Sequence, residues 1–63
     1  MTKKDYIRFA NVLAEKKDLF GIPNETVDMP SQMFHELVSD IADIFEDDNK
    51  RFDRDEFFKA IYR

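Results

Sequence analysis

The chain has 63 residues, a formal net charge of −4 and no cysteine. A chain this short forms one domain, residues 1–63, which buries only about 60% of the surface that its unfolded form exposes, and without cysteine it has neither a disulfide framework nor a thiolate metal site. No apolar run approaches the roughly 18 residues of a membrane span, and the N-terminus lacks the apolar core of a signal peptide. We therefore expect a soluble, cytoplasmic protein.

The charge is distributed unevenly along the chain. Residues 18–49 contain nine acidic side chains and no Lys or Arg, whereas residues 1–17 carry a net charge of +3 and residues 50–63 a net charge of +2. Such a layout can steer a partner electrostatically, or it can let the basic ends fold against the acidic middle of the same molecule.

The first predicted helix covers residues 3–20. Thr2 is a good N-cap with Asp5 at the third helical position, an Asp variant of the capping box, and Gly21 with Pro23 forms a stop signal. Apolar side chains recur at steps of three and four and predict one broad apolar face: Tyr6, Ile7, Phe9, Ala10, Val12, Leu13 and Phe20.

Residues 21–31 form the longest irregular segment, in which we expect Ile22, Val27 and Met29 to pack over the core. The second predicted helix, residues 31–47, begins with either Asp28 or Ser31 as its cap, because a proline at position 30 is tolerated in both cases. Its apolar set follows helical spacing and makes this helix the centre of the core: Phe34, Leu37, Val38, Ile41, Ala42, Ile44 and Phe45.

The outer face of this helix carries Glu36, Asp40, Asp43 and Asp47, spaced four, three and four residues apart. No lysine within the helix offsets these four carboxylates, so they repel one another by a few tenths of a kcal/mol per pair. A surface kept only for solubility could as well have mixed signs. We therefore predict that these four residues, here called the acidic row, bind a partner.

A third helix, residues 54–62, follows a short connection, residues 48–53, here called the corner. Asp53 and Glu56 have the spacing of a capping box, and Phe52 with Phe57 has the spacing of a hydrophobic staple. No segment alternates with period two, as a strand would. The sequence thus predicts an all-α fold, a compact three-helix domain, and it also allows a homodimer in which the long helices pair.

The corner partly matches the calcium loop of an EF-hand. With Glu56 at the twelfth position, Asp47, Asn49 and Asp53 fall on the third, fifth and ninth ligand positions. The first position is then Phe45, which has no oxygen in its side chain, and the sixth is Lys50 instead of glycine. A degenerate EF-hand-like calcium binder stays as an alternative hypothesis, but we predict no metal site.

Catalytic residues are not evident. His35 is the only histidine, Ser31 and Ser39 have no evident base partner, and no glycine-rich loop could cradle a phosphate. So small a domain should also offer little room for a pocket of several hundred cubic ångströms. We predict a protein that is not an enzyme and that has no catalytic residue and no cofactor.

Nucleic-acid binding through the basic ends is a second alternative, although the net charge is negative and the basic residues do not cluster on one helix face. The candidate side chains are Lys3, Lys4, Arg8, Lys16, Lys17, Lys50, Arg51, Arg54, Lys59 and Arg63.

One pattern has a known counterpart. The segments Met1–Tyr6, Ile41–Asp43, Asp48–Arg54 and Phe57–Ala60 together resemble a group of small bacteriophage and prophage proteins of unassigned function, which end in Asp-Asn-Pro-Arg-Phe-Asp-Arg before a short last helix. Lys50 replaces the usual proline, and residues 21–31 have no counterpart. The resemblance covers roughly half the chain and implies a phage accessory protein with no known catalytic residue.

Our leading hypothesis is therefore a small protein in the cytoplasm of a host cell that binds a host or phage protein through the acidic row. A role in host takeover or counter-defence would fit this hypothesis.

Overall fold

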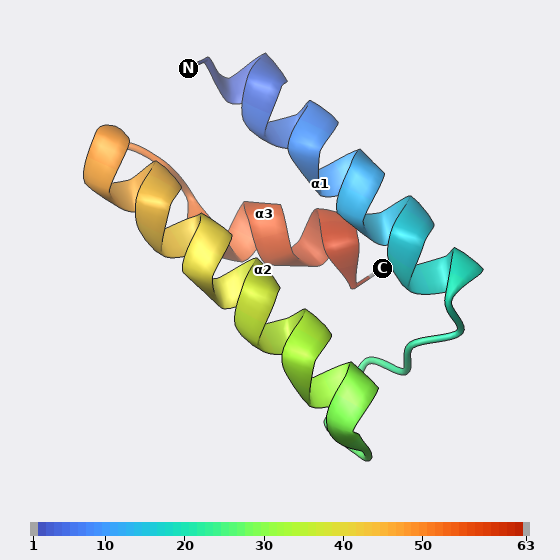
Figure 1. Ribbon diagram of the computed structural model, residues 1–63. Helices are drawn as coiled ribbons and strands as arrows, with labels where there is room; N and C mark the ends of the chain where they lie inside the picture. Colours follow the sequence, from blue (N-terminus) through green and yellow to red (C-terminus); the bar gives the residue numbers. More distant parts are fainter. Residues whose placement is uncertain (1, 63) are drawn as a thin grey trace.

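Three helices make up the computed structural model, which describes residues 2–62: α1 (Lys3–Leu19), α2 (Met29–Asp48) and α3 (Arg54–Ile61). Figure 1 shows α1 and α2 side by side and running in opposite directions, with α3 between them in this view. No strand occurs in residues 2–62, so the predicted all-α, three-helix fold is confirmed. None of the helices in this range is long and apolar enough to cross a membrane.

Both ends of α1 follow local sequence signals. The Asp5 N–H donates to the Thr2 hydroxyl at 3.4 Å and the Thr2 N–H donates to the Asp5 carboxylate at 3.2 Å, which is the predicted capping box. At the other end Gly21 has a φ of +66°, the left-handed conformation that glycine adopts without strain. The Ile22 N–H reaches back to the Lys17 carbonyl at 2.9 Å, so α1 ends in a Schellman turn one residue before the predicted position.

The start of α2 resolves the choice between two caps in favour of Asp28. Its carboxylate accepts the Ser31 N–H at 2.9 Å, and the fully buried Ser31 hydroxyl accepts the N–H groups of Asp28 and Val27 at 3.1 and 3.0 Å. Ser31 thus acts as the third residue of the helix in a reciprocal capping box. As a result, α2 begins two residues before the predicted range and ends one residue after it.

The core lies where the three helices meet, and its centre is aromatic. Four rings from α1, α2, the corner and α3 surround one another with centroid distances between 4.7 and 5.5 Å. They are the rings of Tyr6, Phe45, Phe52 and Phe57, all less than a tenth exposed. The Phe52–Phe57 contact is the predicted staple, which fixes α3 against the end of α2.

Two local expectations are wrong. Ile22 is half-buried against the core, but Val27 and Met29 are 65% and 64% exposed, because they flank a cap whose polar bonds orient the backbone and leave their side chains in solvent. Only half of the predicted Asp53–Glu56 box forms. The Asp53 carboxylate accepts the Glu56 N–H at 3.1 Å, whereas the Glu56 carboxylate instead pairs with Lys3 of α1 at 3.2 Å.

Candidate functional site

The four carboxylates of the acidic row are all exposed on the outer side of α2. Asp43 is held by the Arg54 guanidinium of α3 at 2.7 Å. Glu36, Asp40 and Asp47 have no hydrogen bond or ion pair to any residue of the described range 2–62. Three of the four predicted site residues therefore present carboxylates whose hydrogen-bonding capacity is not used within the molecule.

Arg54, one of the candidate nucleic-acid contacts, has a structural role. Its guanidinium lies 3.9 Å from the Glu46 carboxylate in addition to the short contact with Asp43, and it stacks over the Phe58 ring with 5.4 Å to the centroid. The side chain is 28% exposed. It therefore joins α2 to α3, and its charge only partly compensates the acidic helix.

The charges of the helices differ sharply. Within its bounds α2 has six acidic residues and no Lys or Arg, a formal charge of −6, whereas α1 has five basic and three acidic residues, a charge of +2. The two acidic and two basic residues of α3 cancel. The negative field of the molecule is therefore concentrated along α2, on the side turned away from the core.

An exposed apolar surface lies next to the acidic row, and the sequence reasoning missed it. Six large apolar side chains, all but Met33 predicted by helical spacing to lie on buried faces, are between 46% and 69% exposed, and we call them the apolar face: Phe9, Val12 and Phe20 of α1 with Met33, Leu37 and Ile44 of α2. The signal was the width of the apolar arc of each helix, which is larger than two neighbouring helices can cover.

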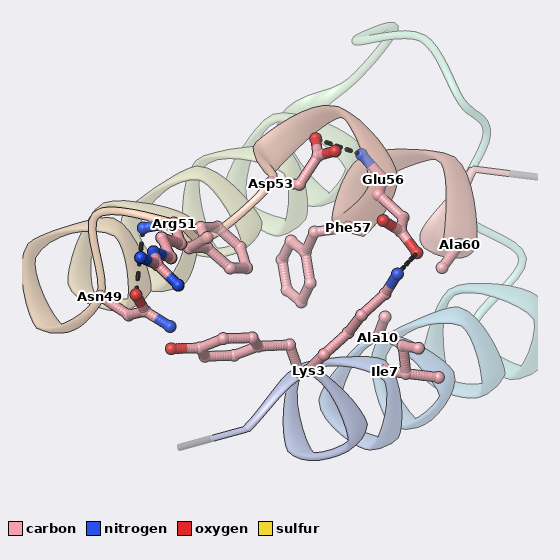
Figure 2. Close-up of a pocket in the computed structure, with 11 residues that line it drawn as sticks. Lys3, Ile7, Ala10, Asn49, Arg51, Asp53, Glu56, Phe57 and Ala60 are labelled. Carbon is pink, nitrogen blue, oxygen red and sulfur yellow. Dashed lines mark hydrogen bonds and ion pairs between the residues drawn. The ribbon is translucent and has the colours of Figure 1, made fainter.

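Three of the four side chains proposed as calcium ligands are bonded elsewhere, and Asp47 is the exception. The Asn49 amide oxygen accepts the Arg51 N–H at 3.0 Å, Asp53 caps α3, and Glu56 pairs with Lys3, as Figure 2 shows. Within residues 2–62 no three His, Cys, Asp or Glu side chains are placed to hold a metal ion. The corner is thus built from bonds that close a turn and start a helix.

A cavity of about 460 Å³ lies between the start of α1 and the corner (Figure 2). Its volume falls in the range of small-ligand sites, so the expectation that the domain has little room for such a pocket is wrong. Phe57, Ala10 and Ala60 form apolar parts of its lining, and the buried Tyr6 hydroxyl beside it has no hydrogen-bond partner. The cavity could accept an apolar group together with one hydrogen bond.

His35, the only candidate for acid–base chemistry, has a structural role in this fold. Its Nε2 lies 3.0 Å from the Pro23 carbonyl and its Nδ1 lies 2.8 Å from the Tyr62 hydroxyl. Because a carbonyl can only accept, Nε2 carries the proton and Nδ1 accepts from Tyr62. Burial raises the pKa of that tyrosine. The imidazole thus ties the 21–28 segment and the end of α3 to α2.

Part of the basic set proposed for nucleic acid is paired within the fold. Lys3 pairs with Glu56, Arg54 pairs with Asp43, and Lys17 is only 7% exposed and lies 3.7 Å from Asp18. Arg63 lies outside the described residues. Several of the cations proposed for nucleic acid are therefore engaged within the fold.

Comparison of the chain with protein families, curated proteins and solved structures finds no match.

Proposed function

We propose that this chain is a small, non-enzymatic accessory protein of bacteriophage type that binds a host or phage protein in the host cytoplasm through the acidic row. The observation that carries the proposal is that Glu36, Asp40 and Asp47 are exposed, lie in line along one helix and have no partner within the described residues. Like charges that repel one another at helical spacing are relieved when a basic partner binds.

The surroundings of the row support a protein as the partner. Met33, Leu37 and Ile44 of α2 are each more than half exposed and lie beside the row on the same helix. Protein interfaces typically combine an apolar centre with a polar rim, and complementary charges accelerate their association. A basic protein surface with apolar side chains therefore fits this helix better than a nucleic acid, whose phosphates the row would repel.

Affinity capture from the lysate of a candidate host tests the proposal. The test variant carries Glu36→Gln, Asp40→Asn and Asp47→Asn, and the control carries Glu15→Gln, Glu25→Gln and Asp55→Asn, the same change of charge at exposed positions away from the row. We expect the wild type and the control to capture the same protein in stoichiometric amounts, in a manner that weakens as salt is raised. Equal capture by the row variant would refute the assignment of the row.

A further inference from the structure

The apolar face is one continuous surface on the side of the molecule that faces away from α3. Helix α1 meets the cavity and α3 along Lys3, Ile7 and Ala10. Phe9 is two residues from Ile7, which is about 200° around the helix, so Phe9 lies on the side of α1 away from α3. Helix α2 meets α3 through His35 and Asp43.

On α2, Met33 and Leu37 are each two residues from His35, again about 200° around the helix, so they lie on the side of α2 away from α3. Phe9 also touches Phe45 of α2, with ring centroids 5.2 Å apart, so the two halves of the apolar face meet at the seam between α1 and α2.

The area of the apolar face is that of a protein interface. Aromatic side chains offer about 150 to 250 Å² each and aliphatic ones lie toward the lower end of that range, so the six exposed fractions correspond to roughly 500 to 700 Å². A standard stable interface buries about 800 Å² per partner. An exposed apolar patch above a few hundred Å² on a soluble protein marks an interaction site.

We propose that a second copy of this chain covers the apolar face, with α1 of each copy packed on α2 of the other. The result is a four-helix bundle, made of two facing pairs of α1 and α2, with one α3 helix on each outer side. This inference does not rest on the proposed function, although it uses the same side of α2. The second copy covers Met33, Leu37 and Ile44 and pairs with Asp40 and Asp47, and it leaves Glu36 and Asp43 at the outer edge of the pair.

The helix charges select this arrangement over its alternative. A two-fold axis that runs across the helices would place α2 on α2, and would bring together two helices of charge −6 each. A two-fold axis parallel to the helices places α2, with −6, on α1, with +2. Opposite charges across an interface favour the second arrangement, and like charges penalise the first.

The same symmetry predicts which charged side chains meet. Residue 9 of α1 is level with residue 45 of the antiparallel α2, so Lys16 is level with Val38 and Arg8 with Glu46. An axis parallel to the helices keeps each residue at its own level. Lys16 of one copy then reaches Asp40 of the other, and Arg8 reaches Asp47.

Lys16 and Asp40 border the apolar face directly. Lys16 is four residues from both Val12 and Phe20, and Asp40 is three residues from Leu37 and four from Ile44. Each therefore lies on the same side of its helix as these apolar residues.

Sedimentation equilibrium of the purified chain is the first test. We expect the mass of the wild type to rise from that of one chain, 7.6 kDa, toward twice that mass as the concentration is raised from micromolar to millimolar. The double variant Leu37→Lys/Ile44→Lys should raise the dissociation constant of the dimer at least about 100-fold, because it places charge in the apolar contact. Its added lysines lie among the acidic residues of α2, so the monomer should stay folded, which far-UV circular dichroism checks.

Val27→Lys is the matched control, because Val27 is equally exposed but lies outside both helices. It should leave the dimer intact. A wild type that stays monomeric up to millimolar concentration, or a dimer that Leu37→Lys/Ile44→Lys does not weaken, would overturn the proposal while leaving the proposed function untouched.

A charge exchange tests the arrangement independently of any loss of apolar contact. Lys16→Glu and Asp40→Lys should each weaken the dimer several-fold, and the two together should restore it, because the pair is re-formed with its signs reversed. A double variant that dimerises no better than the single variants would show that α1 does not pack on α2 of the second copy.

Discussion

Phe52 is the side chain on which the corner between α2 and α3 depends. It is 8% exposed and its ring packs edge-on against Tyr6, Phe45 and Phe57. Phe52→Ala should lower the free energy of unfolding by about 3 to 5 kcal/mol, because it removes buried area and leaves a cavity. Urea unfolding measures this. Val27→Ala, at an exposed position, should cost less than about 0.5 kcal/mol, and an equally small loss for Phe52→Ala would contradict the packed corner.

Asp28 makes the stability of the fold depend on pH in the acidic range. The backbone N–H of Ser31, with help from its hydroxyl, lowers the pKa of Asp28 below its ordinary value of 3.8. A lowered pKa in the folded state means that the stabilisation is present above pH 3.8 and is lost as the pH falls through the folded value. Thr2 lowers the pKa of Asp5 in the same way at the start of α1.

Urea midpoints measured from about pH 5 down to about pH 2 should therefore fall for the wild type and fall less for Asp28→Asn, which cannot gain the proton. Glu25→Gln, which removes a carboxylate in the neighbouring segment, serves as the comparison. If the urea midpoint of Asp28→Asn fell with pH as much as that of the wild type, the Asp28 cap would not be the source of the pH dependence.

At the scale of the element, the start of α2 depends on one buried hydroxyl. The Ser31 hydroxyl accepts two backbone N–H groups and donates to the Asp28 carbonyl at 2.9 Å. Ser31→Ala should cost about 1 to 3 kcal/mol, because two part-buried backbone donors lose the hydroxyl that accepts from them. Ser39→Ala on the same helix, where no such bonds form in the described residues, should be nearly neutral in the same thermal or urea unfolding experiment.

The sequence predicted the helices well because their signals are local. Helical periodicity, the Thr2 cap and the glycine stop each depend on residues a few positions apart. The start of α2 stayed open because Asp28 and Ser31 can each cap a helix, and only their mutual bonds decide which one does. Glu56 does not complete the predicted capping box with Asp53, because Lys3, distant in sequence, lies beside it in the fold and pairs with it.

The acidic row was visible in the sequence, whereas the apolar face and the cavity were not. Periodicity states that Phe9, Leu37 and Ile44 share an apolar side of their helices, but not how many neighbours cover that side. The answer depends on where α3 packs, and α3 lies on the opposite side of α1 and α2. Likewise the cavity beside Tyr6 exists because the corner and α1 approach each other without filling the space between them.

At the scale of the whole molecule, the three helices divide the chain into a packed side and an exposed side. The aromatic core, the corner and the His35–Tyr62 bond hold α3 against one side of α1 and α2. The other side presents the apolar face, with the acidic row along its border. Association through the outer surfaces of α1 and α2 is therefore the central claim.

Residue-resolved NMR of the backbone amides, recorded as the protein concentration is raised from micromolar to millimolar, tests this claim most directly. We expect concentration-dependent shifts along the outer sides of α1 and α2, at Phe9, Val12, Leu37 and Ile44, with little change at Phe57 and Ala60 beside the cavity. Shifts confined to the cavity and the corner, or none over the whole range, would contradict it.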